Sequence, residues 1–182
     1  RCDGHTVQIC ESSGLWRAST TCPYTCEGDG VCKGTNIVCW GDNSFGQTSP
    51  PEGKYVSVLS GYRHSCAWRA DGAATCWGDN SMGQASPPAG KFRMLAPGAE
   101  HTCGLLESGQ IVCWGSNGRG ATDAKPGAYE YVVSGLHFSC GLKLTGEVEC
   151  WGDNTFGQSS PPAGSYSAIA AGDAHACAVG ES

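Results

Sequence analysis

Thirteen cysteines are the residues whose chemistry the sequence offers most clearly. Zinc sites normally use closely spaced CxxC pairs, and the cysteines beyond residue 34 are not spaced in that way. Six of them instead form three pairs. The two cysteines of each pair lie ten residues apart, on either side of a residue that suits a turn. Residues opposite each other in a hairpin have Cβ atoms roughly 4.5–5.5 Å apart, which small adjustments bring within disulfide distance. The spacing therefore predicts three disulfides: Cys66–Cys76, Cys103–Cys113 and Cys140–Cys150.

Histidine occurs two residues before several of these cysteines and could act as a general base. In His64-Ser65-Cys66, however, adjacent side chains point to opposite faces of a strand, so they form no nucleophile–base pair. A catalytic residue is needed only once in a protein, whereas a structural residue recurs in every repeat, as this histidine does. In one repeat the histidine is replaced by Phe138, which favours a packing role. We therefore expect no catalytic residues and no enzymatic activity, and a structural role for His64, His101 and His175.

Asp-Asn pairs at residues 42–43, 79–80 and 153–154 offer oxygen ligands for calcium. They lack the alternating acidic residues and the closing glutamate of a hand-type calcium loop. Capping of their own turns is the interpretation we favour. The sequence also has no phosphate loop, nucleophile elbow or dinucleotide fingerprint. We therefore predict neither a metal nor a cofactor.

A repeat of 37 residues carries all of these side chains. Cys39-Trp40-Gly41 recurs at residues 76–78, 113–115 and 150–152, and Gly61 recurs as Gly98, Gly135 and Gly172. Within one repeat we expect strands at residues 54–59, 64–68 and 74–78, a hairpin loop at 70–72 and an irregular connection at 79–88. The repeated tryptophans are predicted to pack in the core or between repeats: Trp40, Trp77, Trp114 and Trp151.

One repeat cannot bury both faces of a small sheet, so neighbouring repeats must stack. Three or four strands per repeat predict an all-β fold of propeller-type blades, three full and a partial fourth. A parallel β-solenoid is the alternative, but its coils are usually shorter and lack hairpins.

The two ends of the repeat region are each incomplete. Residues 35–39 look like a returning strand without its outgoing strand, and residues 174–179 like an outgoing strand without its return. Pairing them, with Cys39 opposite Cys177, would complete one blade. This could occur within one chain, giving a four-bladed ring, or between two chains as a homodimer. The alternative is that the sequence is a fragment of a longer protein.

Residues 1–34 do not share the repeat and form a predicted separate module, followed by a repeat domain at 35–182. So short a segment normally needs disulfides or a metal to replace a hydrophobic core. We favour disulfides over a metal site built from Cys22, Cys26, Cys32 and His5, and leave the pairing open. Because thirteen is odd, one cysteine is free or pairs outside the chain. The module's five cysteines are Cys2, Cys10, Cys22, Cys26 and Cys32.

Composition restricts the classes of partner. Acidic residues outnumber basic ones 17 to 11, which argues against nucleic acid. No apolar run is long enough for a membrane span, and the start has no signal-peptide pattern. The high cysteine content predicts an oxidising compartment, and therefore a secreted or cell-surface protein.

The unit CWGDNxxGQxxPPxGxYxxVxxGxxHSCAxxxDGxxxCWG resembles the repeat of the regulator of chromosome condensation family. It is closest to the cysteine-bearing version in secreted bacterial proteins, and is similar to the propeller-type inhibitor of β-lactamases. Residues 1–34 resemble short bacterial cysteine-rich modules. The resemblance over residues 35–182 implies a β-propeller, usually of seven blades, so this chain departs in blade number. Residues 115–121 also depart, because they lack the consensus Asp and Gln.

Partner-binding residues are expected where the repeats differ on a constant scaffold. The resemblance points to loops on one propeller face, and Tyr62, Arg63 and Leu136 are residue types common at binding hot spots. Neutral variation at exposed turns is the alternative explanation. The aligned positions after each turn glycine are Tyr62-Arg63, Ala99-Glu100, Leu136-His137 and Asp173-Ala174.

We therefore predict a secreted or cell-surface protein that binds a protein partner, an inhibitor being one form of such a protein. A structural or adhesive surface protein is the first alternative, and carbohydrate binding through exposed tryptophans is another. Guanine-nucleotide exchange, as in nuclear members of the family, is disfavoured by the short acidic chain and its disulfide pattern.

Overall fold

The computed structural model describes residues 2–3, 6–10, 16–18 and 36–180, and the side chains of residues 36–180. Every regular element in these ranges is a β-strand, and none of them contains a helix that could span a membrane. β1 (Cys2–Asp3), β2 (Thr6–Cys10) and β3 (Trp16–Ala18) form a small sheet of their own. The cysteine pairing and the metal alternative predicted for residues 1–34 concern side chains outside the described part.

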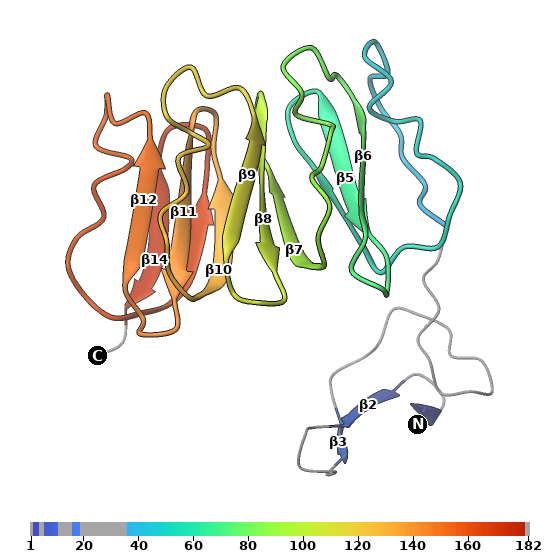
Figure 1. The fold of residues 1–182 in the computed structure, drawn as a ribbon, viewed down its shortest axis with the longest axis horizontal. Coiled ribbons are helices and arrows are strands. Elements are labelled where there is room, and N and C mark those ends of the chain that lie inside the picture. Colours follow the sequence, from blue (N-terminus) through green and yellow to red (C-terminus); the bar gives the residue numbers. More distant parts are fainter. Residues whose placement is uncertain (1, 4–5, 11–15, 19–35, 181–182) are drawn as a thin grey trace.

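The remaining strands form four antiparallel sheets that stand side by side in chain order (Figure 1). Each is a simple meander, in which consecutive strands pair. The first sheet contains β4 (Ser57–Ser60), β5 (His64–Trp68) and β6 (Ala74–Gly78), and the second contains β7 (Phe92–Pro97), β8 (His101–Leu106) and β9 (Ile111–Gly115). The third contains β10 (Tyr129–Ser134), β11 (Phe138–Lys143) and β12 (Val148–Gly152), and the fourth β13 (Tyr166–Ala171) and β14 (Ala176–Gly180).

The all-β fold of propeller-type blades is confirmed, with three full blades and a two-stranded fourth. The strands predicted at residues 64–68 and 74–78 have those bounds in the structure, whereas the first strand begins later, at Ser57. Residues 36–39, predicted as part of a strand, are not in one. A strand needs a hydrogen-bonded partner, and no described strand pairs with this segment, although Ile37 and Cys39 pack against the first blade.

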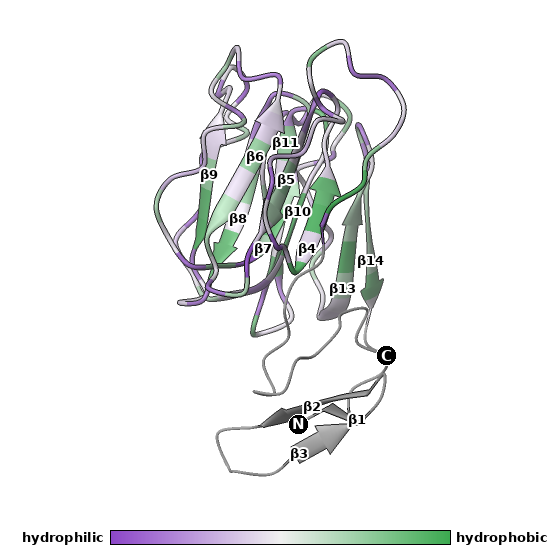
Figure 2. Ribbon diagram, turned by 90° about the vertical axis from the view of Figure 1, so that its right-hand side faces the viewer, coloured by the Kyte–Doolittle hydropathy of each residue, from purple (hydrophilic) through white to green (hydrophobic). Residues whose placement is uncertain are grey.

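The hydrophobic core lies between neighbouring sheets. Phe92 and Leu95 of β7 pack toward Cys66 of the first sheet, and Ile169 of β13 packs on Phe138 and Leu142 of β11. Inward-facing hydrophobic residues produce the hydrophobic stretches along the strands in Figure 2. Each blade therefore depends on the next for the burial of one face, as expected for a repeat protein.

The repeated turn glycines are explained by how closely the blades approach. A Cβ atom at Gly61 would lie 2.5 Å from the carbonyl oxygen of Gly98, and one at Gly98 would lie 2.6 Å from that of Gly135. The same holds for Gly135 against Gly172, at 2.5 Å. Contacts this short are excluded for real side chains, so only glycine allows the turns of adjacent blades to touch.

Candidate functional site

Disulfide bonds fix the second and third strands of each full blade. Cys66–Cys76, Cys103–Cys113 and Cys140–Cys150 are all formed, which is the pairing that the spacing predicts. The two cysteines of each pair are directly opposite in the strand register. The first cysteine of each pair is buried against the neighbouring blade. Each hairpin is therefore a covalently closed unit within the stack.

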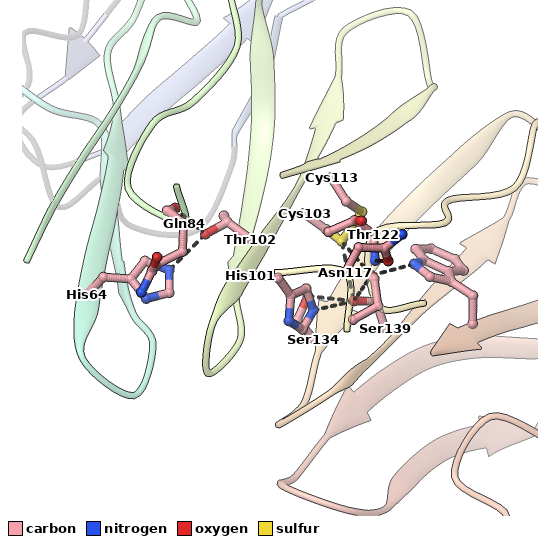
Figure 3. Close-up of a disulfide and its surroundings, with 12 residues drawn as sticks. His64, Gln84, His101, Thr102, Cys103, Cys113, Asn117, Thr122, Ser134 and Ser139 are labelled. Atoms are coloured by element: carbon pink, nitrogen blue, oxygen red, sulfur yellow. Dashed lines mark hydrogen bonds between the residues drawn. A yellow bond between two sulfur atoms is a disulfide. The ribbon is translucent and has the colours of Figure 1, made fainter. Parts of the chain in front are cut away.

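Buried histidines join neighbouring blades through hydrogen bonds to hydroxyl groups (Figure 3). His64 Nε2 lies 2.8 Å from Thr102 Oγ1, and His101 Nε2 lies 2.8 Å from Ser139 Oγ. The Thr102 hydroxyl donates its one hydrogen to the carbonyl oxygen of Gln84, at 2.9 Å. His64 must therefore donate from Nε2, which leaves its Nδ1 as an unprotonated acceptor that makes no hydrogen bond.

Burial keeps both imidazoles neutral. It lowers the pKa of His64 to about 4, and the nearby Asp79 carboxylate opposes that change only in part. Burial also lowers the pKa of His101 to about 4, assisted by His64 and His137. A histidine–hydroxyl pair can activate a nucleophile, but these pairs are buried and recur in successive blades. Their geometry suits a bond that holds blades together.

At the third interface the histidine and its partner change together. Phe138 occupies the position of His64 and His101, and Ala176 occupies that of Thr102 and Ser139. Phe138 is fully buried. Reasoning from the sequence missed the histidine–hydroxyl pairs, because the partners are 38 residues apart in different blades. The joint change at Phe138 and Ala176 is the signal that could have revealed them.

The repeated tryptophans contact the connection that precedes their own blade. The indole N–H of Trp77 donates to Gln47 O, that of Trp114 to Gln84 O and that of Trp151 to Ala121 O, each at 2.9 Å. Trp77 and Trp151 are buried and Trp114 is half-buried, in keeping with a packing role.

The first tryptophan and the last histidine differ from the rest of their series. The side chain of Trp40 is 85% exposed, so the packing predicted for it is not seen among the described residues. His175 is likewise exposed, unlike His64 and His101. Both lie at an end of the stack, where no described blade covers them (Figure 1).

The Asp-Asn pairs cap the connections that contain them. Asp79 Oδ1 accepts a hydrogen bond from the Ser81 amide at 3.0 Å, and Asn80 Oδ1 accepts one from the Ala85 amide at 2.9 Å. The pairs at 42–43 and 153–154 make equivalent bonds. Their carboxylate and amide oxygens are therefore used within the turn, and the turn-capping interpretation is confirmed.

The connection at residues 115–121 is held differently, as its sequence suggested. Asn117 keeps the amide cap by accepting from the Thr122 amide at 3.1 Å. Ala121 stands where the other connections have a glutamine. Arg119 instead reaches Asp153 of the next connection and forms an ion pair of 2.8 Å.

The variable turns form one continuous row across the four blades. The Tyr62 amide donates to Gly98 O at 3.2 Å, and the Leu136 amide donates to Asp173 O at 2.9 Å. The turns also line a shared depression to which every described blade contributes. The structure therefore brings together the first of each pair of predicted partner-binding positions: Tyr62, Ala99, Leu136 and Asp173.

The side chains of this row differ in accessibility. Tyr62 is 68% exposed, and Arg63, Glu100, Asp173 and Ala174 are also exposed. Leu136 lies at 36%, and His137 is half-buried. Ala99 is buried, so its side chain offers a partner almost no area. The residue type explains the difference, because a methyl group at this close approach does not protrude beyond the backbone.

Arg63 is held over aromatic rings rather than projecting freely. Its guanidinium carbon lies 4.5 Å from the ring centre of Phe45 and 5.2 Å from that of Tyr62. Cation–π contacts of this kind order the arginine side chain before any partner arrives. Arg63 and Tyr62 therefore form one preorganised patch at the first turn.

The predicted Cys39–Cys177 disulfide is not formed within the chain. Both residues are free thiols, and Cys177 is exposed. The four sheets stand in an open row, with residues 36–41 at one end and β14 at the other (Figure 1).

Comparison with protein families finds the regulator of chromosome condensation (RCC1) repeat three times, at residues 55–84, 96–121 and 130–158. These matches cover much of the first three blades and the connections that follow them. A search of curated protein sequences found no significant match.

Solved structures include similar propellers from plants and yeast. The ectodomain of the receptor kinase CR4 from Physcomitrella patens is 31% identical, with a TM-score of 0.60 over 70% of this chain and 36% of that chain. The CRINKLY WD40 ectodomain of the receptor kinase ACR4 from Arabidopsis thaliana is 28% identical, with a TM-score of 0.60 over 70% of this chain and 47% of that chain. The present chain thus spans less than half of either ectodomain. Yeast RCC1 (Prp20), solved with Kap60, shares the fold at 15% identity, with a TM-score of 0.62 over 79% of this chain and 50% of that chain.

Proposed function

The chain carries three regulator of chromosome condensation repeats, and on that premise we propose that it binds a protein partner outside the cell through its row of variable turns. The observation that carries the proposal is that row itself. Turns from all four blades meet in one depression, on a scaffold whose repeated residues stay constant. Inhibition of an enzyme is one form that such binding could take.

The scaffold supports the proposal because it holds the turns rigidly. Glycines at Gly61, Gly98 and Gly135 allow each turn to touch the next, and backbone hydrogen bonds join the first turn to the second and the third to the fourth. The disulfides and the buried histidines fix the strands behind them. A rigid surface loses little conformational entropy on binding, so more of its contact energy becomes affinity.

The side chains on the row also suit protein recognition. Tyr62 and Arg63 form a preorganised aromatic and cationic patch, and Leu136 adds an apolar side chain two blades further along. Tyrosine and arginine are enriched among residues that dominate binding energy at protein interfaces. We expect Tyr62 to contribute more than Ala99, whose side chain is buried.

Two observations support an extracellular location. Three disulfides persist most readily in an oxidising compartment. The two plant structures are also both ectodomains of receptor kinases. We propose no enzymatic activity, since His64 and His101, the histidines that pair with hydroxyl groups, are buried between blades.

Parallel screens of the whole chain against arrays of extracellular proteins and of glycans would test this function. Tyr62→Ala and Leu136→Ala should each weaken binding to a captured protein about tenfold, the loss expected for a hot-spot side chain. Leu144→Ala is the matched control, because Leu144 is exposed just after β11, at the opposite end of the strand from Leu136. Binding to glycans alone, or equal losses in Leu144→Ala and Leu136→Ala, would contradict the proposal.

A further inference from the structure

A polar cavity lies between the second and third blades, inside the stack. It is lined by Glu100 and His101 of the second turn, by His137 of the third turn and by the connection at residues 115–121. Its volume is about 250 Å³, far more than one water molecule needs. Both blades that enclose it are complete three-stranded sheets, so an unfilled end of the stack does not produce it.

The cavity exists because the third connection has smaller side chains than the other three. Ala121 stands where each of the others has a glutamine, and Gln84 at that position is fully buried beside the ring of His64 (Figure 3). Ser116 stands where the others have aspartate, and Gly118 where they have serine or threonine. A Cβ atom at Gly118 would meet nothing closer than Ser116 Oγ, at 3.8 Å. No other side chain has therefore moved in to fill the space.

The shortened side chains leave two backbone N–H groups without the acceptors that the other connections supply. In the second connection, Gln84 Oε1 accepts from the Met82 amide at 2.8 Å, and Asp79 caps the amide before it. The same pair of bonds occurs in the first and fourth connections. The equivalent amides in the third are those of Gly118 and Arg119, and no side chain in the described part of the chain accepts from either.

Charge decides which kind of acceptor fits these amides. Glu100 is exposed and forms no ion pair with the described residues, whereas the Arg119 guanidinium is already paired with Asp153. A carboxylate ligand would therefore meet an uncompensated negative charge, and an alkyl ligand would leave the amides without an acceptor. A carboxamide is neutral and has both an acceptor oxygen and two N–H donors.

We propose that this cavity binds a carboxamide group, which replaces the glutamine side chain that the third connection lacks. Its oxygen accepts from the Arg119 amide, as Gln84 Oε1 accepts from that of Met82, and its NH2 group donates to the Glu100 carboxylate. Two sources offer this chemistry: a glutamine side chain of a bound protein and a free primary amide. Only the first source rests on the proposed binding function.

The first test titrates propionamide into the whole chain and follows the backbone amide signals of Gly118 and Arg119 by NMR. We expect both signals to shift and to saturate in the millimolar range. Propionate and butanone have the same shape, but the first is charged and the second has no donor. Both should bind at least tenfold more weakly. A titration that does not saturate, or propionate binding as tightly as propionamide, would overturn the proposal.

Variants at the cavity test its position. Ala121→Gln fills the cavity with a carboxamide of the chain's own, and Ala121→Met fills it with an apolar side chain. Both should abolish the response to propionamide. Arg119→Ala is the matched control, because it removes a side chain at the same cavity but keeps the backbone N–H. Its affinity should be unchanged. Binding that survives in both filled variants, or that is lost in Arg119→Ala, would refute the assignment.

The two filled variants also test the cavity without added ligand. Ala121→Gln should unfold at a higher urea concentration than Ala121→Met, because only glutamine gives the Arg119 amide an acceptor. Glutamine should be accepted here, since it occupies the same position in the other three connections. Equal unfolding midpoints would contradict recognition of an amide.

The source of the carboxamide is identified with two blocked peptides, Gly-Gln-Gly and Gly-Glu-Gly. Tenfold tighter binding of the glutamine peptide than of propionamide would identify a protein side chain as the source, and weaker binding would identify a free amide. Tighter binding of the glutamate peptide would contradict carboxamide recognition. All these titrations use the chain alone, so their failure would leave the proposed protein-binding function intact. Failure of the protein screen would likewise leave propionamide binding intact.

Discussion

The first two blade interfaces and the third solve one packing problem in different ways. His64 with Thr102, and His101 with Ser139, connect blades through buried hydrogen bonds. At the third interface Phe138 packs in a cluster with Leu142 and Ile169, and the hydroxyl position is Ala176. A buried polar group is tolerated when its partner is present, and an apolar pair avoids the need for one.

This difference shows that the unit under constraint is the pair rather than the residue. A histidine facing Ala176 would lose its hydrogen-bond partner, and a phenylalanine facing Thr102 would deprive the hydroxyl of one. Burying an unpaired polar group costs about 1–3 kcal/mol. The histidine position and the hydroxyl position belong to neighbouring blades. A change at the histidine position of one repeat must therefore be matched by a change at the hydroxyl position of the next repeat.

Acid should weaken the first two interfaces far more than the third. The folded-state pKa of His64 and of His101 is about 4, below the value of 6.5 for an unperturbed histidine. Between these values the unfolded chain binds more protons, so stability is present above pH 6.5 and is lost as pH falls toward 4. We expect the free energy of unfolding to decrease by about 2 kcal/mol per histidine between pH 7 and pH 5.

Denaturant titrations at intervals across that pH range would measure this loss. The variant His101→Phe with Ser139→Ala is the internal control, because it removes one of the two buried histidines together with its partner. It should lose about half of the pH dependence. Unfolding that is equally sensitive to pH in both proteins would show that the buried histidines are not its source.

The next-largest effect is the difference in stability between single and paired substitutions at the second interface. His101→Phe alone removes the imidazole partner of the buried Ser139 hydroxyl, which keeps Ser134 as a partner, and should destabilise the chain by about 1 kcal/mol, the net value of one hydrogen bond. Adding Ser139→Ala reproduces the pairing of Phe138 with Ala176 and should recover at least half of that loss. A double-mutant cycle at pH 7 gives the coupling between the two sites. Losses that simply add would show that the pair is not a unit.

Much of the fold could be predicted from the sequence because its information is local. The strands at 64–68 and 74–78 and the three disulfides each lie within a single hairpin, where spacing alone sets the register, and the 37-residue period repeats that hairpin. The turn-capping role of Asp79 and Asn80 is local in the same sense, since each bonds within its own connection.

What could not be predicted depends on contacts between blades. The bond from His64 to Thr102 joins two sheets, and no pattern within one repeat specifies it. Trp40 has the same local sequence as Trp77, yet its side chain is exposed because no described blade covers it. The accessibility of the turns also escaped prediction: at the same close approach of neighbouring turns, Tyr62 protrudes and Ala99 is buried.

The smallest effect should come from the ion pair that also links the second and third blades. Arg119 and Asp153 lie at 2.8 Å, but Arg119 is more than half exposed, so water screens the attraction. Arg119→Ala should therefore leave the free energy of unfolding unchanged within error at physiological salt, in contrast to His101→Phe at the same interface. Denaturant titrations of both variants at low and high salt would measure the contrast. If Arg119→Ala destabilised the chain as much as His101→Phe does, the exposed ion pair would stabilise the second interface as much as the buried hydrogen bond. The buried hydrogen bond would then not be what distinguishes the second interface from the third.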